Sequence, residues 1–141
     1  MKFWDSSAIV CVVAEQSGDE KLQQIMADDP NVVIWWGTRV EIASGLHRLR
    51  CEGGIDDQGF SAFLRTAEQI VEDADETEST DRVRLGAVRM LEAHRLRAAD
   101  AVQLSSALCW ADNDPLGKGF VCLDKRLREA AEIEGFDVLP K

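Results

Sequence analysis

Short apolar runs alternate along this chain with longer segments of helical periodicity, and this alternation constrains the fold more than any other feature. The runs are continuous rather than alternately polar, which is typical of strands buried on both faces of a parallel sheet. We expect strands at Lys2 to Trp4, Val32 to Trp36, Phe120 to Leu123, and Val138 to Leu139. Strands that alternate with helices predict an α/β sandwich around a mostly parallel central sheet.

The segments between these runs have helical spacing or helix-boundary residues. We expect helices at Ser6 to Ala27 with an interruption at Gly18, Thr38 to about Gly53, Phe60 to Ile70, Arg82 to Leu96, Ala98 to Ala111, and Lys125 to Glu134, the last ended by Gly135. The acidic stretch EDADETEST predicts an exposed connection, with at most a short strand near Asp73 to Asp75. The stretch DNDPLGKG predicts a loop.

The size and charge of the chain narrow the class of protein. Its 141 residues suit one domain, residues 1–141, and its longest apolar run, Ala8 to Ala14, is much shorter than the roughly 20 residues that span a bilayer. Asp5 also stands where a signal peptide carries positive charge. We therefore expect a cytoplasmic protein without membrane association. The net charge of -10 argues against broad adhesion to nucleic acid, although a local basic groove stays possible.

The cysteines, histidines and clustered basic residues receive structural interpretations. The four cysteines lack zinc-ligand spacing and are interpreted as buried reduced thiols: Cys11, Cys51, Cys109 and Cys122. Neither His47 nor His94 is assigned to catalysis. We interpret the basic clusters as solvated helix faces: Arg48 with Arg50, Arg95 with Arg97, and Lys125 with Arg126 and Arg128.

Four carboxylates lie at expected strand ends or helix starts: Asp5, Glu41, Asp100 and Asp124. Each has a structural explanation. Asp5 and Asp124 suit helix N-caps, and Asp100 suits the first turn of a helix, where it interacts favourably with the helix dipole. Glu41 suits a capping box with Thr38, three residues earlier.

The same four residues also suit a metal site when they are considered together. A parallel sheet gathers its strand ends at one edge, where ligands of such folds bind. Crowded carboxylates raise one another's pKa unless a cation compensates. Oxygen ligands without histidine or cysteine suit Mg²⁺ or Mn²⁺, and magnesium accepts substrate phosphate in its coordination shell. The pattern therefore indicates phosphoryl chemistry.

The chain resembles the PIN-domain ribonucleases, and within them the VapC-like toxins of toxin-antitoxin pairs. The resemblance covers essentially the whole length and rests on MKFWDSSAIV, TRVEIASGLHRLR, HRLRAADAVQLSSAL and GFVCLDKRLREAAEIEGFDVL. It places the acidic quartet of that family on the same four residues. It implies a PIN-like α/β/α sandwich. Trp4, the Trp35–Trp36 pair and the stretch EDADETEST depart from the usual pattern and leave the shape of the RNA groove open.

The resemblance implies a metal-dependent endoribonuclease that hydrolyses RNA with Mg²⁺ or Mn²⁺. Asp5 and Asp100 would be the surest metal ligands, with Glu41 and Asp124 completing the site. Ser6 is a candidate supporting residue or helix cap, and Arg97 is a candidate phosphate or carboxylate contact. The implied partners are RNA, a cognate antitoxin protein and a second copy in a homodimer. The apolar faces at Phe60 and Phe63 or at Trp35 and Trp36 are candidates for the dimer contact or for core packing.

Three other functions compete with the toxin hypothesis. The first is a PIN-domain nuclease of RNA processing that has no antitoxin. The second is a PIN-like scaffold that binds RNA or protein without cutting, which the presence of all four acids disfavours. The third is an aspartyl phosphotransferase or phosphoreceiver. The sequence lacks the phosphatase motif DxDxT at Asp5, where it reads DSSA.

Overall fold

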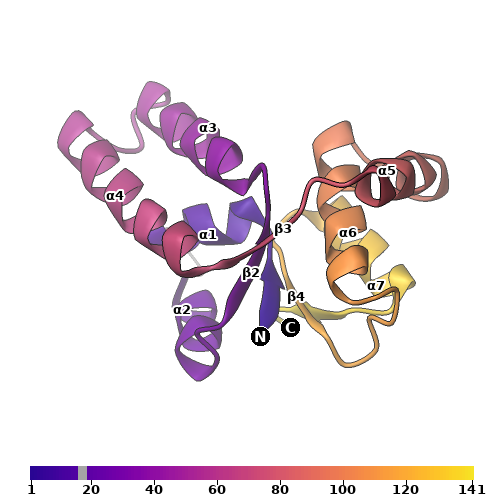
Figure 1. Ribbon diagram of the computed structural model, residues 1–141. Coiled ribbons are helices and arrows are strands. Elements are labelled where there is room, and N and C mark those ends of the chain that lie inside the picture. Colours follow the sequence, from indigo (N-terminus) through magenta and orange to yellow (C-terminus); the bar gives the residue numbers. More distant parts are fainter. Residues whose placement is uncertain (16–18) are drawn as a thin grey trace.

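The structure is a computed structural model and describes residues 1–15 and 19–141 (Figure 1). Its elements are, in order, β1 (Lys2–Trp4), α1 (Ser6–Val13), α2 (Asp19–Asp28), β2 (Val32–Trp35), α3 (Thr38–Cys51), α4 (Asp57–Asp73), β3 (Asp75–Thr77), α5 (Asp81–His94), α6 (Ala98–Trp110), β4 (Gly119–Val121), α7 (Lys125–Glu134) and β5 (Asp137–Leu139). The expected helix interruption at Gly18 lies outside the described residues. No described helix is long and apolar enough to cross a membrane.

The five strands form one sheet in the order β3-β2-β1-β4-β5, and every pairing is parallel. Helices α1 to α4 cover one face and α5 to α7 cover the other (Figure 1). The expected α/β/α sandwich of the PIN-like type is therefore confirmed. Parallel strands are joined by crossover helices, so all five strands end at the same edge of the sheet.

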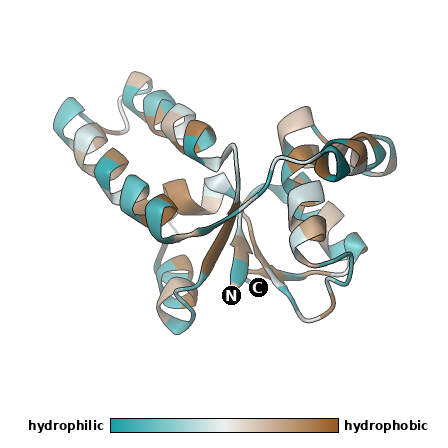
Figure 2. Cartoon of the chain, viewed as in Figure 1, coloured by the Kyte–Doolittle hydropathy of each residue, from teal (hydrophilic) through white to brown (hydrophobic). Residues whose placement is uncertain are grey.

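The sheet separates two hydrophobic cores, because neighbouring side chains of a strand point to opposite faces. Phe3 and Trp4 are both completely buried, Phe3 in the core beneath α5 to α7 and Trp4 in the core beneath α1 to α4. Figure 2 shows that the strands at the centre of the sheet are largely hydrophobic, whereas the helices carry hydrophilic residues beside hydrophobic ones. Two fully buried aromatic residues at the end of β1 thus fix the position of the residue that follows them.

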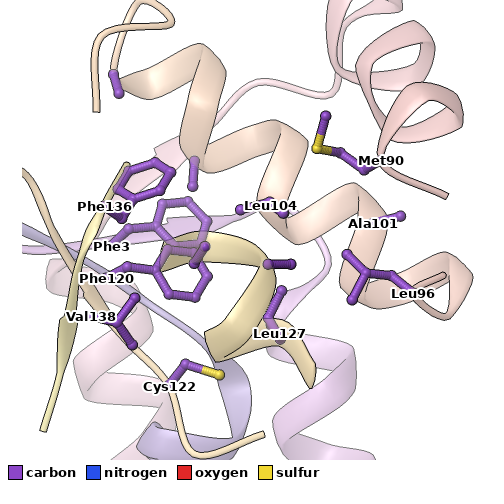
Figure 3. Packing of buried hydrophobic residues seen from close by; sticks show 14 of the residues in the cluster. Phe3, Met90, Leu96, Ala101, Leu104, Phe120, Cys122, Leu127, Phe136 and Val138 are labelled. Atoms are coloured by element: carbon purple, nitrogen blue, oxygen red, sulfur yellow. The ribbon is translucent and has the colours of Figure 1, made fainter. Parts of the chain in front are cut away.

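Aromatic rings form the centre of the core beneath α6 (Figure 3). The rings of Phe3 and Phe120 stack with centroids 5.4 Å apart and an interplanar angle of 8°. Phe136 packs against Phe120 at the same centroid distance, with its ring tilted by 49°. Leu104 joins this cluster from α6. The packing holds α6 in a defined position over β1 and β4.

Several element boundaries differ from the expected ones. The first helix ends at Val13 instead of continuing, and Glu15 adopts a left-handed φ of 49°. Strand β3 lies at Asp75–Thr77, two residues beyond its expected position. Strand β4 ends at Val121, because its partner β1 ends at Trp4, and the chain then turns into the cap of α7.

Some expected burial patterns are wrong. Cys51 is exposed at the end of α3 and Cys109 is partly buried, although no disulfide links any of the described cysteines. Arg128 is not a solvated residue, since its guanidinium donates to the carbonyl oxygens of Cys122, Leu139 and Pro140 at 2.6 to 2.9 Å. These bonds tie α7 to the ends of β4 and β5.

The structure distinguishes the two alternatives for the aromatic residues, which are core packing and a dimer contact. Phe60 is buried in the core, and its ring contacts His47 and the guanidinium of Arg50. Trp35 is half-buried, whereas Trp36 is 62% exposed. Core packing therefore accounts for Phe60, while Trp36 remains available at the surface.

Helices α5 and α6 approach each other closely at Gly86. A Cβ atom at this position would overlap the hydroxyl of Ser105, which is buried and donates to the Val83 carbonyl at 2.8 Å. The absent side chain of Gly86 thus sets how closely α5 can pack against α6.

This contact predicts a coupling between two substitutions. In a Ser105→Ala background, we expect Gly86→Ala to stabilise the protein by about 1 kcal/mol, the gain in helix propensity. In the otherwise unchanged protein, we expect overpacking of roughly 1–3 kcal/mol to cancel or reverse this gain. The four free energies of unfolding are measured in urea, and equal effects of Gly86→Ala in both backgrounds would contradict the packing argument.

Candidate active site

The structure brings the four expected carboxylates together at the carboxyl edge of the sheet. We call Asp5, Glu41, Asp100 and Asp124 the acidic cluster. Asp5 directly follows β1, and Asp124 caps α7 just beyond β4. Glu41 and Asp100 lie in the first turns of α3 and α6, which stand on opposite sides of the sheet (Figure 1). Mutual charge effects on their pKa values link all four carboxylates.

Asp5 is only 3% exposed and its carboxylate accepts several hydrogen bonds. Oδ2 accepts from the backbone N–H of Ser7 at 3.1 Å and from the Ser7 hydroxyl. Oδ1 accepts from Nε2 of Gln103 at 2.7 Å. Asp5 is thus the N-cap of α1, as expected, and it also belongs to the acidic cluster. The structural and chemical interpretations of this residue are compatible, since one oxygen caps the helix while the other faces Gln103.

Glu41 does not form the capping box that its spacing from Thr38 suggests. The N-cap of α3 is Gly37, which makes no side-chain cap, and the buried Thr38 hydroxyl has no hydrogen-bond partner. Instead, Oε2 of Glu41 accepts from the indole Nε1 of Trp35 and from Nε2 of Gln103, both at 3.1 Å. The Trp35 ring lies against Gly37, where a Cβ atom would overlap it. The absent side chain at Gly37 therefore lets the indole direct Glu41 toward the acidic cluster.

Burial and mutual repulsion perturb the acidic cluster. Burial raises the pKa of Glu41, and the charges of Asp5 and Asp100 raise it further, against opposing hydrogen bonds from Trp35 and Ser6. Burial likewise raises the pKa of Asp100, with the charges of Asp124 and Asp5 adding to the effect and Arg97 opposing it. Such shifts record the cost of gathering negative charge in a partly desolvated place. Perturbed pKa values of this kind cluster at functional sites.

Asp124, Ser6 and Arg97 are also found close to this edge. Asp124 is exposed and caps α7 through Oδ1, which accepts from Leu127 N–H at 2.9 Å. The Ser6 hydroxyl lies 3.5 Å from Asp5 Oδ1 and hydrogen-bonds to Glu41. Arg97 is the exposed N-cap residue of α6, and its charge lowers the pKa of Asp100. Ser6 therefore supports two carboxylates, and Arg97 supplies positive charge beside a third.

Sequence reasoning missed four residues that support the acidic cluster: Ser7, Trp35, Gln103 and Cys122. Only Gln103 had a usable signal, because it follows Asp100 by three positions and so shares its helix face. The Cys122 thiol donates to Asp5 Oδ2 at 3.5 Å. Burial and the charge of Asp5 raise the pKa of this thiol, so it is a protonated donor and not a nucleophile.

The chemistry of these side chains suits a hard cation. The acidic cluster offers carboxylate oxygens without imidazole, and the carbonyl oxygen Oε1 of Gln103 is buried without a hydrogen-bond partner. Within residues 1–15 and 19–141, however, no three His, Cys, Asp or Glu side chains form a ready-made metal-binding group. Between Asp5 and Glu41 the Gln103 amide nitrogen bonds to both carboxylates. The chemistry of the donor atoms therefore suits Mg²⁺ or Mn²⁺, but the amide of Gln103 bridges two of the carboxylates, those of Asp5 and Glu41.

A pocket of about 390 Å³ adjoins the acidic cluster. Its lining includes Ser6, Ser7 and Glu41 together with Arg48 and Glu52. Arg48 is exposed, so its guanidinium is free of the core and can meet an anionic group. The pocket thus combines the carboxylate edge with a cationic side chain.

Comparisons with known proteins identify the fold but no family. No protein-family model and no curated protein matches this chain. A chain of a toxin-antitoxin complex from Klebsiella pneumoniae superimposes with a TM-score of 0.65 and 13% identity, over 99% of this chain and 97% of that one. The protein PAE2754 from Pyrobaculum aerophilum also reaches 0.65, with 15% identity over 97% and 87% of the two chains. The chain therefore shares its whole fold with a component of a toxin-antitoxin complex.

The raised pKa of Glu41 predicts how stability depends on pH. Its folded value lies above the ordinary 4.5, so the folded state binds this proton more tightly than the unfolded state. The free energy of unfolding therefore falls as the pH rises from the unfolded through the folded value. Glu41→Gln removes this titration but keeps an acceptor oxygen. We expect the melting temperature of Glu41→Gln minus that of the original protein to be more positive at pH 7 than at pH 4.

This experiment is done by circular dichroism in EDTA, with Glu68→Gln as its control. Glu68 is exposed on α4, away from the acidic cluster. The control should shift the melting temperature equally at both pH values. A Glu41→Gln difference that does not change with pH would contradict the raised pKa.

Proposed function

We propose that this protein is a metal-dependent endoribonuclease that acts as the toxin of a toxin-antitoxin pair. The observation that carries the proposal is the meeting of Asp5, Glu41, Asp100 and Asp124 at the carboxyl edge of a parallel sheet. The pKa values of Glu41 and Asp100 are raised there, which is the condition that a divalent cation relieves.

Asp5 and Asp100 would hold Mg²⁺ or Mn²⁺, with Glu41 and Asp124 bound directly or through water. A divalent ion at such a site polarises a phosphoryl oxygen and lowers the pKa of bound water. Ser7 and Cys122 fix the orientation of Asp5 through their hydrogen bonds, and Trp35 fixes Glu41. These residues spare the acidic cluster from reorganising when charge develops on the substrate.

An acidic protein needs local positive charge to approach RNA. Arg48 lines the pocket beside Glu41, and Arg97 lies close enough to Asp100 to affect its pKa. We infer that these arginines contact phosphates on either side of the bond that is cut. Trp36, exposed where β2 meets α3, offers a ring for base stacking.

The toxin role draws its support from the fold shared with a chain of a toxin-antitoxin complex. On this proposal, the partner is a cognate antitoxin protein, and the homodimer implied by the resemblance to VapC-like toxins is a further prediction. A PIN-domain nuclease of RNA processing would use the same acidic cluster without an antitoxin. A non-catalytic scaffold would not need raised carboxylate pKa values at a strand edge.

The nuclease proposal is tested with the purified protein, total cellular RNA and either Mg²⁺, Mn²⁺ or EDTA. We expect cleavage that requires a divalent ion and that falls about 100-fold or more in Asp5→Asn. Asparagine caps helices as well as aspartate, so this variant should keep the start of α1. Cleavage products are mapped by sequencing their ends.

Asp56→Asn is the matched control for this test. Asp56 caps α4 through a 2.7 Å bond from Gly59 N–H and is not part of the acidic cluster. The same substitution at a second N-cap should therefore leave cleavage unchanged. Equal cleavage by Asp5→Asn and Asp56→Asn, or cleavage in EDTA, would rule out the proposed site.

The toxin proposal has a separate readout in growing cells. We expect induced expression in a bacterial host to arrest growth, and Asp5→Asn to abolish the arrest while Asp56→Asn preserves it. Co-expression of the gene adjacent to the toxin gene should restore growth. Metal-dependent cleavage in vitro without any growth defect would favour the RNA-processing nuclease instead.

A further inference from the structure

Gln103 has the most unusual environment in the acidic cluster. It lies on α6, one turn beyond Asp100, and is 1% exposed. Its Nε2 donates to Asp5 Oδ1 at 2.7 Å and to Glu41 Oε2 at 3.1 Å, so the amide bridges carboxylates from two different elements. Its Oε1 is buried and has no hydrogen-bond partner. The amide nitrogen therefore makes two hydrogen bonds, whereas the amide oxygen makes none.

This arrangement is costly, because a buried carbonyl oxygen without a partner has lost its hydration and gained nothing in return. The opposite orientation of the amide is no better in the absence of a cation. The oxygen and nitrogen of a glutamine amide sit on the same carbon, so rotating the amide exchanges their places. The rotation would then point Oε1 at the carboxylates of Asp5 and Glu41, which repel it.

A divalent cation between these carboxylates reverses the preference. The cation repels the N–H groups and attracts the carbonyl oxygen, since amide oxygens are ligands for hard cations. Rotation of the amide would give Oε1 the cation as its partner and would remove the bridging nitrogen from the place that the cation needs, while the N–H groups would move to the buried place that Oε1 occupied.

We propose that Gln103 is a metal-coupled positioning residue whose amide rotates when a divalent cation binds. Before binding, its N–H groups hold Asp5 and Glu41 in place of the cation. After binding, its Oε1 faces the ion. This inference rests on the divalent cation of the proposed function, but it does not depend on RNA being the substrate.

The rotation is tested by NMR on the ¹⁵N-labelled protein during titration with Mg²⁺, which is diamagnetic. The Gln103 side-chain NH₂ signals are assigned by their absence in Gln103→Leu and, should that variant fold poorly, in Gln103→Glu. In the metal-free protein we expect them downfield of the signals of exposed Gln69, as for donors to carboxylates. At saturating Mg²⁺ we expect them to move upfield, while the Gln69 signals stay in place.

Calorimetric titration with Mn²⁺ supplies a second readout. Loss of the amide in Gln103→Leu should weaken Mn²⁺ binding by about tenfold or more. Gln69→Leu is the matched control on the surface of α4 and should bind Mn²⁺ like the original protein. Unchanged or tighter binding by folded Gln103→Leu would overturn the proposal, because the amide would then compete with the cation without contacting it.

The NMR result separates rotation from a fixed structural bridge. Gln103 NH₂ signals that stay in place when Mg²⁺ saturates the protein would overturn the rotation, even if Mn²⁺ affinity falls in Gln103→Leu. If the protein also cleaves RNA with Mg²⁺, only this inference fails. If the protein binds neither Mg²⁺ nor Mn²⁺, the metal-dependent function fails together with the inference.

Discussion

The burial of one carboxylate, that of Asp5, is the constraint on which the site depends. Phe3 and Trp4 are packed into separate cores on the two faces of the sheet, so the next residue has no freedom to leave the strand end. A buried carboxylate is tolerated only when donors surround it. Ser7, Gln103 and Cys122 supply them from three segments of the chain, and the folded arrangement of these segments is thereby tied to one charge.

The carboxylates of the acidic cluster are held in place in two different ways. Asp5 and Asp124 are N-caps and stabilise α1 and α7, which offsets part of the electrostatic repulsion between the carboxylates. Glu41 makes no cap, and its orientation comes instead from an indole and an amide. Its side chain is therefore held by tertiary contacts and not by helix formation.

Much of this fold and part of the site followed from the sequence for physical reasons. Continuous apolar runs predicted buried parallel strands, and a parallel sheet places Asp5, Asp100 and Asp124 at a common edge without further information. The capping box of Thr38 and Glu41 failed because local spacing does not reveal that the Trp35 ring lies over Gly37. Gln103 was overlooked because a polar residue in a helix is normally solvated. Its spacing from Asp100 places it on the same helix face, but its burial follows from the packing of α6 on the sheet.

The order of the strands determines when the sheet and the acidic cluster can form during synthesis. The central strand β1 comes from the first residues, yet one of its two neighbours, β4, is formed by Gly119–Val121 near the other end. Asp5 N–H itself donates to the Val121 carbonyl at 2.8 Å. While these late residues are still within the ribosome, the emerging chain lacks both this neighbour of β1 and Asp124. Pairings over such long sequence separations form slowly. The acidic edge is therefore completed only after Val121 and Asp124 have left the ribosome, and a shorter nascent chain carries only an incomplete site.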